Sequence, residues 1–84
     1  MPDYLQWIRD FVSRRAGGLP ESASTLNYLE AGLIDSFGVI EMLAEIEDRF
    51  GVALNETHFE DPRFVIMEGL AQIVAENARQ AAKT

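Results

Sequence analysis

Apolar residues recur at helical spacing in three segments of the chain, and this periodicity constrains the fold more than any other feature. The segments run over about residues 3–15, 35–50 and 65–79. Apolar positions three or four residues apart lie on one face of a helix. The stripes are Leu5, Ile8, Phe11 and Val12; Val39, Leu43, Ile46 and Phe50, widened by Ile40 and Met42; and Ile66, Leu70, Ile73, Val74 and Asn77. No stretch alternates polar and apolar residues long enough to build a sheet, so we predict an all-α fold.

Glycine and proline mark where the predicted helices end. Gly17-Gly18 follows the first helix and Gly51 the second, and glycine is the usual residue at a left-handed helix end. Pro62 separates a short helix, expected at about 56–61, from the last one. Either Asp35 or Ser36 can cap the second helix. Gly38 in its first turn costs roughly 1 kcal/mol relative to alanine, which indicates that another group approaches closely there.

The segment from Gly17 to Asp35 is a long connection between the first two helices. It holds no period, yet it contains Leu26, Tyr28, Leu29, Leu33 and Ile34. This apolar content predicts a loop that packs across the helices. The 84 residues suffice for one core. We therefore predict a single domain over 1–84, a small four-helix bundle of three main helices and a short third one, with a long loop between the first and second. Val39, Met42, Leu43, Ile46 and Phe50 are assigned to its core.

Composition excludes several classes of function. The chain has no cysteine and one histidine, which removes disulfides, thiolate catalysis and the usual thiolate or histidine metal sites. No apolar run reaches the ~18 residues of a membrane span, and the first residues do not resemble a signal peptide. We therefore expect a cytoplasmic protein that binds no metal. The net charge of −7 repels phosphate backbones, so DNA and RNA are not expected partners.

The negative charge is concentrated in the middle of the chain. Residues 41–61 hold seven acidic side chains and one arginine. Such a block can be a solvated face that aids solubility, or it can steer a basic partner into contact. The sequence pattern alone leaves both readings open.

Signatures of an enzyme are mostly absent. Ser36 lies in Ile34-Asp35-Ser36-Phe37-Gly38, which lacks the first glycine and the strand of a nucleophile elbow. A hydrolytic serine needs a base, and nothing places His58 beside Ser36, so we assign His58 to the surface or rim. There is neither an EF-hand loop nor a glycine-rich phosphate loop with its lysine. Asp35-Ser36 by itself is most simply a helix cap.

A wider context changes the interpretation of that serine. The stretch Gly32-Leu33-Ile34-Asp35-Ser36-Phe37-Gly38, followed by Val39-Ile40-Glu41-Met42-Leu43 and ending in Glu47-Asp48-Arg49-Phe50-Gly51-Val52, closely resembles the attachment motif and second helix of acyl carrier proteins. The resemblance also covers the leading helix, the long loop, the short third helix near Phe59 and the closing helix.

The resemblance implies that Ser36 is an attachment point rather than a catalyst. A magnesium-dependent phosphopantetheinyl transferase would move 4′-phosphopantetheine from coenzyme A onto Ser36, and the thiol of that arm would carry acyl or aminoacyl groups as thioesters. Asp35 would cap the helix and help to present the site. The protein itself would be a stand-alone monomeric carrier without catalytic activity. Its other partners would be a loading ligase and downstream synthases or transferases, in fatty acid, polyketide or nonribosomal peptide metabolism.

The same resemblance assigns the second helix to partner docking. Its candidate residues are Phe37, Ile40, Glu41, Ala44, Glu45, Glu47 and Asp48, which would meet basic patches on partner enzymes. For Phe37 and Ile40 the alternative is core packing. Housekeeping fatty-acid carriers usually have Asp-Ser-Leu and a polar residue, whereas Phe37 and Gly38 stand here. Asp-Ser, an apolar residue and then Gly is more similar to D-alanyl carrier proteins and specialised carriers. The alternatives are therefore a D-alanyl or other aminoacyl carrier, or an unmodified helical interaction module.

Overall fold

The computed structural model describes residues 2–82, with side chains as far as residue 79. Its elements are α1 (Tyr4–Ala16), the 3-10 turn η1 (Ala23–Thr25), α2 (Ser36–Phe50), α3 (Glu56–Glu60), the 3-10 turn η2 (Pro62–Val65) and α4 (Met67–Ala82). Within this part of the chain the one β-type pairing is an isolated bridge between Asn27 and Ile66. The predicted all-α fold, with three main helices and a short third one, is confirmed.

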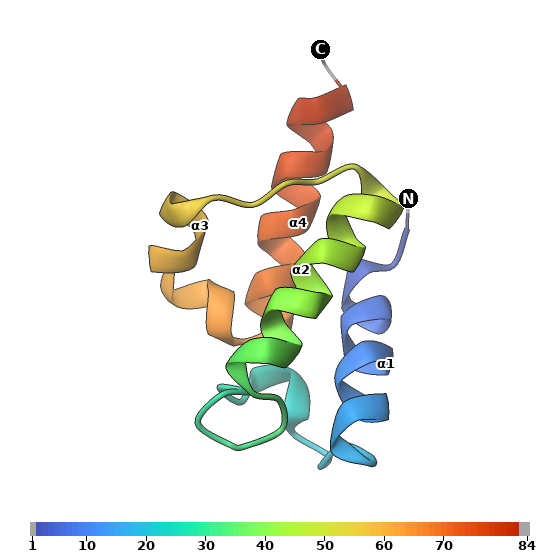
Figure 1. Ribbon diagram of the computed structural model, residues 1–84, viewed down its shortest axis with the longest axis vertical. Coiled ribbons are helices and arrows are strands. Elements are labelled where there is room, and N and C mark those ends of the chain that lie inside the picture. Colours follow the sequence, from blue (N-terminus) through green and yellow to red (C-terminus); the bar gives the residue numbers. More distant parts are fainter. Residues whose placement is uncertain (1, 83–84) are drawn as a thin grey trace.

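Three long helices form the body of the molecule (Figure 1). α2 and α4 run in the same general direction, and α1 runs opposite to both. The segment after α2 crosses over to α3, which lies to one side, and η2 then leads back to the start of α4. Among the described helices none is long and apolar enough to cross a membrane.

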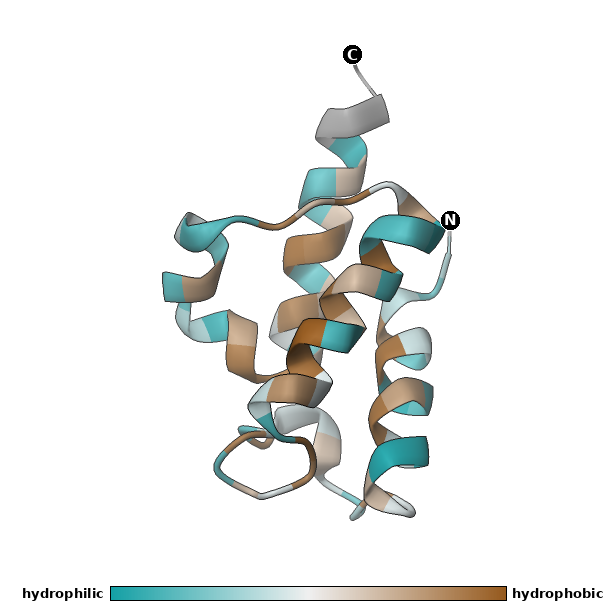
Figure 2. Cartoon of the chain, viewed as in Figure 1, coloured by the Kyte–Doolittle hydropathy of each residue, from teal (hydrophilic) through white to brown (hydrophobic). Residues whose placement is uncertain are grey.

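The core lies where the apolar stripes of the long helices meet. Figure 2 shows the apolar side of α1 turned toward α2. The fully buried large side chains are Tyr28, Ile8, Met42, Ile46, Met67, Leu70, Ile73, Val12 and Val74. Of the core residues assigned to the second helix, Val39, Met42 and Ile46 are buried, while Leu43 and Phe50 are half-buried and pack against the core. The periodicity therefore identified the correct face of each helix.

The start of the last helix differs from its predicted position. Pro62–Val65 form η2, and Asp61 caps this turn by accepting a hydrogen bond from the Arg63 backbone N–H at 2.9 Å. Ile66 then adopts an extended conformation and pairs with Asn27, so α4 begins at Met67. The last helix therefore starts two residues later than the expected position of about residue 65. The delay arises because Ile66 pairs with Asn27 of the long loop before the helix begins.

The long loop packs on the helices as predicted. The side chains of Tyr28 and Ile34 are buried, and Leu26 and Leu33 are half-buried. The Tyr28 N–H donates to the Val65 carbonyl at 3.0 Å, and the Tyr28 hydroxyl donates to the Phe64 carbonyl. These bonds join the loop to η2, far away in sequence, and thereby fix the segment that leads into α2.

Candidate functional site

Ser36 is the first residue of α2 and is exposed to solvent. Asp35 is the N-cap, because its Oδ1 accepts a hydrogen bond from the Gly38 N–H at 2.8 Å. The choice that the sequence left open between Asp35 and Ser36 is thus resolved in favour of Asp35. The cap removes one free N–H of the first turn and leaves the Ser36 hydroxyl available for chemistry.

The residues before Ser36 form a compact turn. Asn27 Oδ1 accepts hydrogen bonds from the N–H groups of Leu29 and Glu30, both at 3.0 Å. Gly32 follows with φ +72°, a left-handed conformation that glycine adopts without strain. The Leu33 N–H then donates to the Tyr28 carbonyl at 3.0 Å, which closes the loop. Backbone hydrogen bonds therefore position the approach to Ser36.

Gly38 lies against the loop, as its place in the first turn predicted. A Cβ at this position would be 2.5 Å from Ile34 Cγ1 and 2.9 Å from Ile34 Cδ1. Ile34 is buried, and its side chain fills the space that an alanine methyl would need. The first turn of α2 therefore packs directly against Ile34, two positions before Ser36.

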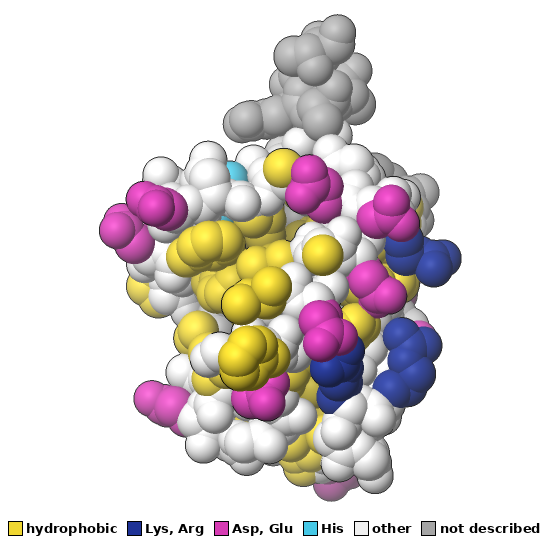
Figure 3. All heavy atoms as spheres, in the orientation of Figure 1, with side chains coloured by type: hydrophobic (Ala, Val, Ile, Leu, Met, Phe, Trp, Pro, Cys, Tyr) yellow, Lys and Arg dark blue, Asp and Glu magenta, His cyan; other side chains and the backbone are white. Residues whose placement is uncertain are grey.

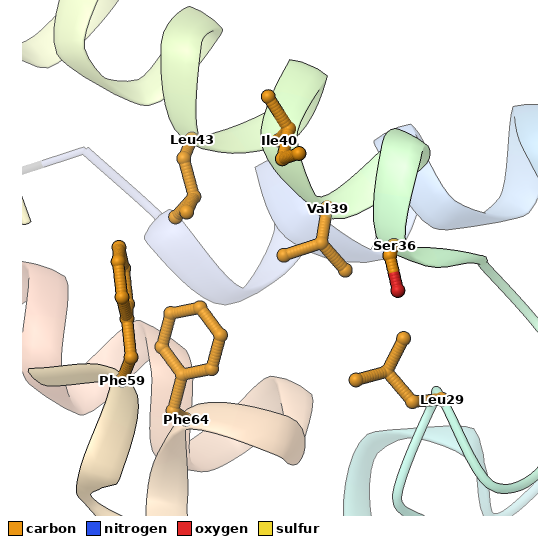
Figure 4. Close-up of a pocket in the computed structure, with 7 residues that line it drawn as sticks. All are labelled: Leu29, Ser36, Val39, Ile40, Leu43, Phe59 and Phe64. Atoms are coloured by element: carbon orange, nitrogen blue, oxygen red, sulfur yellow. The ribbon is translucent and has the colours of Figure 1, made fainter. Parts of the chain in front are cut away.

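An apolar groove opens beside Ser36 (Figure 4). It has a volume of about 230 Å³, and all its lining side chains except the serine are apolar. The lining residues are Leu29, Ser36, Val39, Ile40, Leu43, Phe59 and Phe64. Phe59 and Phe64 form an edge-on aromatic pair with their ring centroids 5.1 Å apart. Figure 4 shows these two rings across from Leu43 and Val39, and the Ser36 hydroxyl pointing toward Leu29.

Sequence reasoning did not find this groove. Its walls come from the long loop, α2, α3 and η2, and no local pattern brings those segments together. The sequence places Phe59 in the short third helix, and no pattern in it marks Phe64 as part of a site. The apolar residues of the loop gave a partial signal, because they predicted packing against the helices.

Exposed apolar and acidic side chains occupy the solvent-facing side of α2. Phe37 is 77% exposed and Ile40 63% exposed, so neither is a core residue. The other predicted docking residues, Glu41, Ala44, Glu45, Glu47 and Asp48, are exposed as well. Figure 3 shows an apolar patch on this face, with acidic side chains on either side of it. The predicted docking residues thus share one surface next to Ser36.

Glu41 differs from the other carboxylates of this surface. Its Oε2 accepts a hydrogen bond from Arg15 Nη2, which forms an ion pair between α1 and α2. This hydrogen bond, before any other cause, raises the pKa of the Arg15 guanidinium. The pairing joins residues 26 positions apart, and nothing in the sequence indicated it.

His58 has a structural role at the start of α3. Its Nδ1 accepts a hydrogen bond from the Asn55 N–H at 3.0 Å, and Asn55 Oδ1 accepts one from the Thr57 N–H at 3.0 Å. Together these bonds form a capping box. His58 is half-buried and belongs to α3, whereas Ser36 begins α2. Within the described structure no hydrogen bond joins His58 to Ser36, so the serine–base pair that a hydrolase would need is not formed there.

The surroundings of Ser36 fit the phosphodiester that the resemblance implies. The hydroxyl lies at the N-terminus of a fifteen-residue helix, where first-turn N–H groups and the positive end of the helix dipole stabilise an anion. Ser36 is held on a rigid turn by the Asp35 cap and the Gly38 contact, yet its side chain is open to solvent. An arm bound here would supply the thiol that the chain, which has no cysteine, does not itself provide.

Comparison with known proteins agrees with this geometry. Residues 6–63 match the family described as "Phosphopantetheine attachment site". Over 35 residues the chain is 46% identical to the D-alanyl carrier protein of Bacillus velezensis. That match covers 42% of this chain and 45% of the relative, so it spans less than half of the relative's length. The family match extends over more than half of the chain and includes Ser36. The chain therefore belongs to the phosphopantetheine-binding family of acyl carrier proteins, whose members carry 4′-phosphopantetheine as a covalent cofactor.

Proposed function

We propose that Ser36 carries the 4′-phosphopantetheine arm and that the protein delivers acyl or aminoacyl thioesters to partner enzymes. The observation that carries this proposal is the position of Ser36, exposed at the first turn of α2 between an apolar groove and an acidic face. On this proposal the chain has no catalytic activity of its own, because its part is to hold and present the arm. It would work in the cytoplasm as a monomer.

Modification of Ser36 is tested by intact-protein mass spectrometry. We expect a broad-specificity phosphopantetheinyl transferase with coenzyme A and magnesium to add the mass of one arm to the purified chain. Ser36→Ala should abolish the addition. Ser22→Ala, at an exposed loop serine, is the matched control and should be modified like the wild type. An unchanged wild-type mass with several active transferases would instead favour an unmodified helical interaction module.

The cargo class is the finer part of the proposal. The D-alanyl carrier relative favours an aminoacyl group. The groove favours an uncharged apolar acyl group, because an ammonium would lose hydration there and find no charged lining side chain. Mass spectrometry of natively purified protein would distinguish the two, since the thioester and its arm would be observed together.

We further propose that the exposed face of α2 is the docking surface. Phe37, Ile40 and Ala44 would supply its apolar contacts. Its charge would come from Glu41, Glu45, Glu47 and Asp48. The partners would be the phosphopantetheinyl transferase, a loading ligase, and synthases or transferases with basic patches. Charge-steered contacts of small area suit a carrier that must dissociate after each step.

A further inference from the structure

A cation from α1 reaches the proposed docking surface of α2. Arg15 Nη2 donates to Glu41 Oε2. The guanidinium carbon of Arg15 also lies 5.0 Å from the centroid of the Phe11 ring, and Phe11 is a buried core residue. Contacts with a carboxylate and with the face of an aromatic ring both hold the guanidinium in place. Arg15 is therefore a positioned charge rather than a freely moving one.

Arg15 also faces the residues that lead into Ser36. It lines a polar hollow of about 360 Å³ with Gly32, Leu33, Ile34 and Asp35. Asp35 and Glu45 add smaller electrostatic contributions to that of Glu41. One arginine thus joins the end of α1, the loop before Ser36 and the acidic side of α2.

The carboxylates of the docking surface are consequently not equivalent. Glu45 and Glu47 form no ion pair among the described side chains and are free to meet a partner's arginine or lysine. Glu41 would first have to exchange Arg15 for that partner. An exposed ion pair such as Arg15–Glu41 contributes little to the stability of the fold. A partner that displaces Arg15 must still break this pair, so its contact with Glu41 adds less binding free energy than a contact with an unpaired carboxylate.

We propose that Arg15 masks Glu41 and thereby sets how strongly the face beside Ser36 binds enzymes with basic patches. This inference rests on the proposed carrier function. It predicts that loss of Arg15 strengthens docking, although Arg15 itself touches neither the arm nor the reacting atoms. Arg15 would accordingly affect the KM of a partner enzyme for the carrier, with kcat unchanged.

Steady-state arm transfer to the full chain tests this proposal. With a phosphopantetheinyl transferase and coenzyme A at low ionic strength, we expect Arg15→Gln to lower KM about two- to fivefold. Arg14→Gln removes an equal charge from the same turn of α1 and should change KM less than about twofold. Glu45→Gln should raise KM in every background. Circular dichroism would verify that each variant keeps its helicity.

The decisive comparison is a double-mutant cycle. Glu41→Gln should raise KM more in the Arg15→Gln background than in the wild type, because only there is the carboxylate free. Equal increases in both backgrounds, or an Arg15→Gln effect no larger than that of Arg14→Gln, would overturn the masking. If the wild type accepts no arm at all, the proposed function fails together with the masking. If the wild type accepts the arm normally and Arg15→Gln has the same KM as the wild type, the masking alone is refuted.

Discussion

Gly38 shows how one residue couples the first turn of α2 to the loop before it. Alanine here would gain up to ~1 kcal/mol in helix propensity. Its Cβ would nevertheless be 2.5 Å from Cγ1 of the buried Ile34. Overpacking of this kind typically costs about 1–3 kcal/mol. We therefore expect Gly38→Ala to lower the free energy of unfolding, measured by urea denaturation.

Gly69 provides the comparison for this substitution. A Cβ on Gly69 would be 2.3 Å from the Arg63 carbonyl oxygen, and backbone yields less readily than a side chain. Gly69→Ala should therefore destabilise the protein more than Gly38→Ala does. A Gly38→Ala variant that is more stable than the wild type would mean that Ile34 moves aside freely, and that the first turn of α2 is not fixed by this contact.

Local sequence patterns correctly predicted the backbone structure around Ser36. The Asp-Ser pair indicated a helix start, and a glycine in the first turn indicated a close contact; both effects operate within a few residues. The Arg15–Glu41 pair could not be predicted in the same way. It depends on how α1 and α2 pack, which the period of each helix alone does not determine.

Of the two short elements, α3 depends on side-chain hydrogen bonds more than on burial, whereas η2 contributes the buried Phe64 to the core. No residue of α3 is buried, and its capping box with Asn55 and His58 satisfies the first N–H groups. The sequence predicted α3 from its place before Pro62, but the 3-10 form of η2 was not predicted. A four-residue turn has too few residues to show a period, and its conformation follows from Asp61 and the contact of Ile66.

The turn η2 is attached to α4 by a small ion network that predicts a pH dependence. Arg63 donates to Asp61 and to Glu76, and both ion pairs measure 2.9 Å. Its guanidinium holds the pKa of the Asp61 carboxyl below its ordinary 3.8 and that of Glu76 below 4.5. A carboxyl group whose pKa is lower in the folded than in the unfolded protein stabilises the fold at pH values above its unfolded pKa. This stabilisation is lost as the pH falls through the pKa of the folded protein.

Arg63→Gln should therefore be less stable than the wild type at pH 7, and the difference should shrink below about pH 4. Thermal unfolding over a pH series measures both effects. Arg49→Gln removes an arginine that forms no ion pair among the described residues and serves as the control. A difference between Arg63→Gln and the wild type that is independent of pH would contradict the ion network as its source.

At the scale of the whole molecule, the long loop brings the parts of the site together. The sequence predicted that the loop packs on the helices, since apolar residues in a segment of nineteen positions need burial. Its partner could not be predicted, because the contact of Tyr28 with Phe64 spans 36 residues. That contact connects the loop carrying Leu29 to η2 carrying Phe64, and both residues line the groove beside Ser36.

The buried hydroxyl of Tyr28 gives this connection a direct test. Burial raises the pKa of the Tyr28 phenol, so the hydroxyl stays a neutral donor to the Phe64 carbonyl at physiological pH. Tyr28→Phe would remove the donor and leave the carbonyl without this partner, which costs about 1–3 kcal/mol. We expect that loss in urea unfolding, together with faster hydrogen exchange at the Tyr28 N–H, which bonds to Val65.

The matched control is Tyr4→Phe. Tyr4 is also buried, but its hydroxyl forms no hydrogen bond within the described residues, so we expect a change within about 0.5 kcal/mol. Equal stability of the two variants would show that the Tyr28 hydroxyl does not hold the loop on η2. A larger loss for Tyr28→Phe, with exchange faster at Tyr28 than in α1, would instead establish that this hydroxyl helps to hold the loop on η2, because no other side-chain hydrogen bond among the described residues joins these two segments beside the groove.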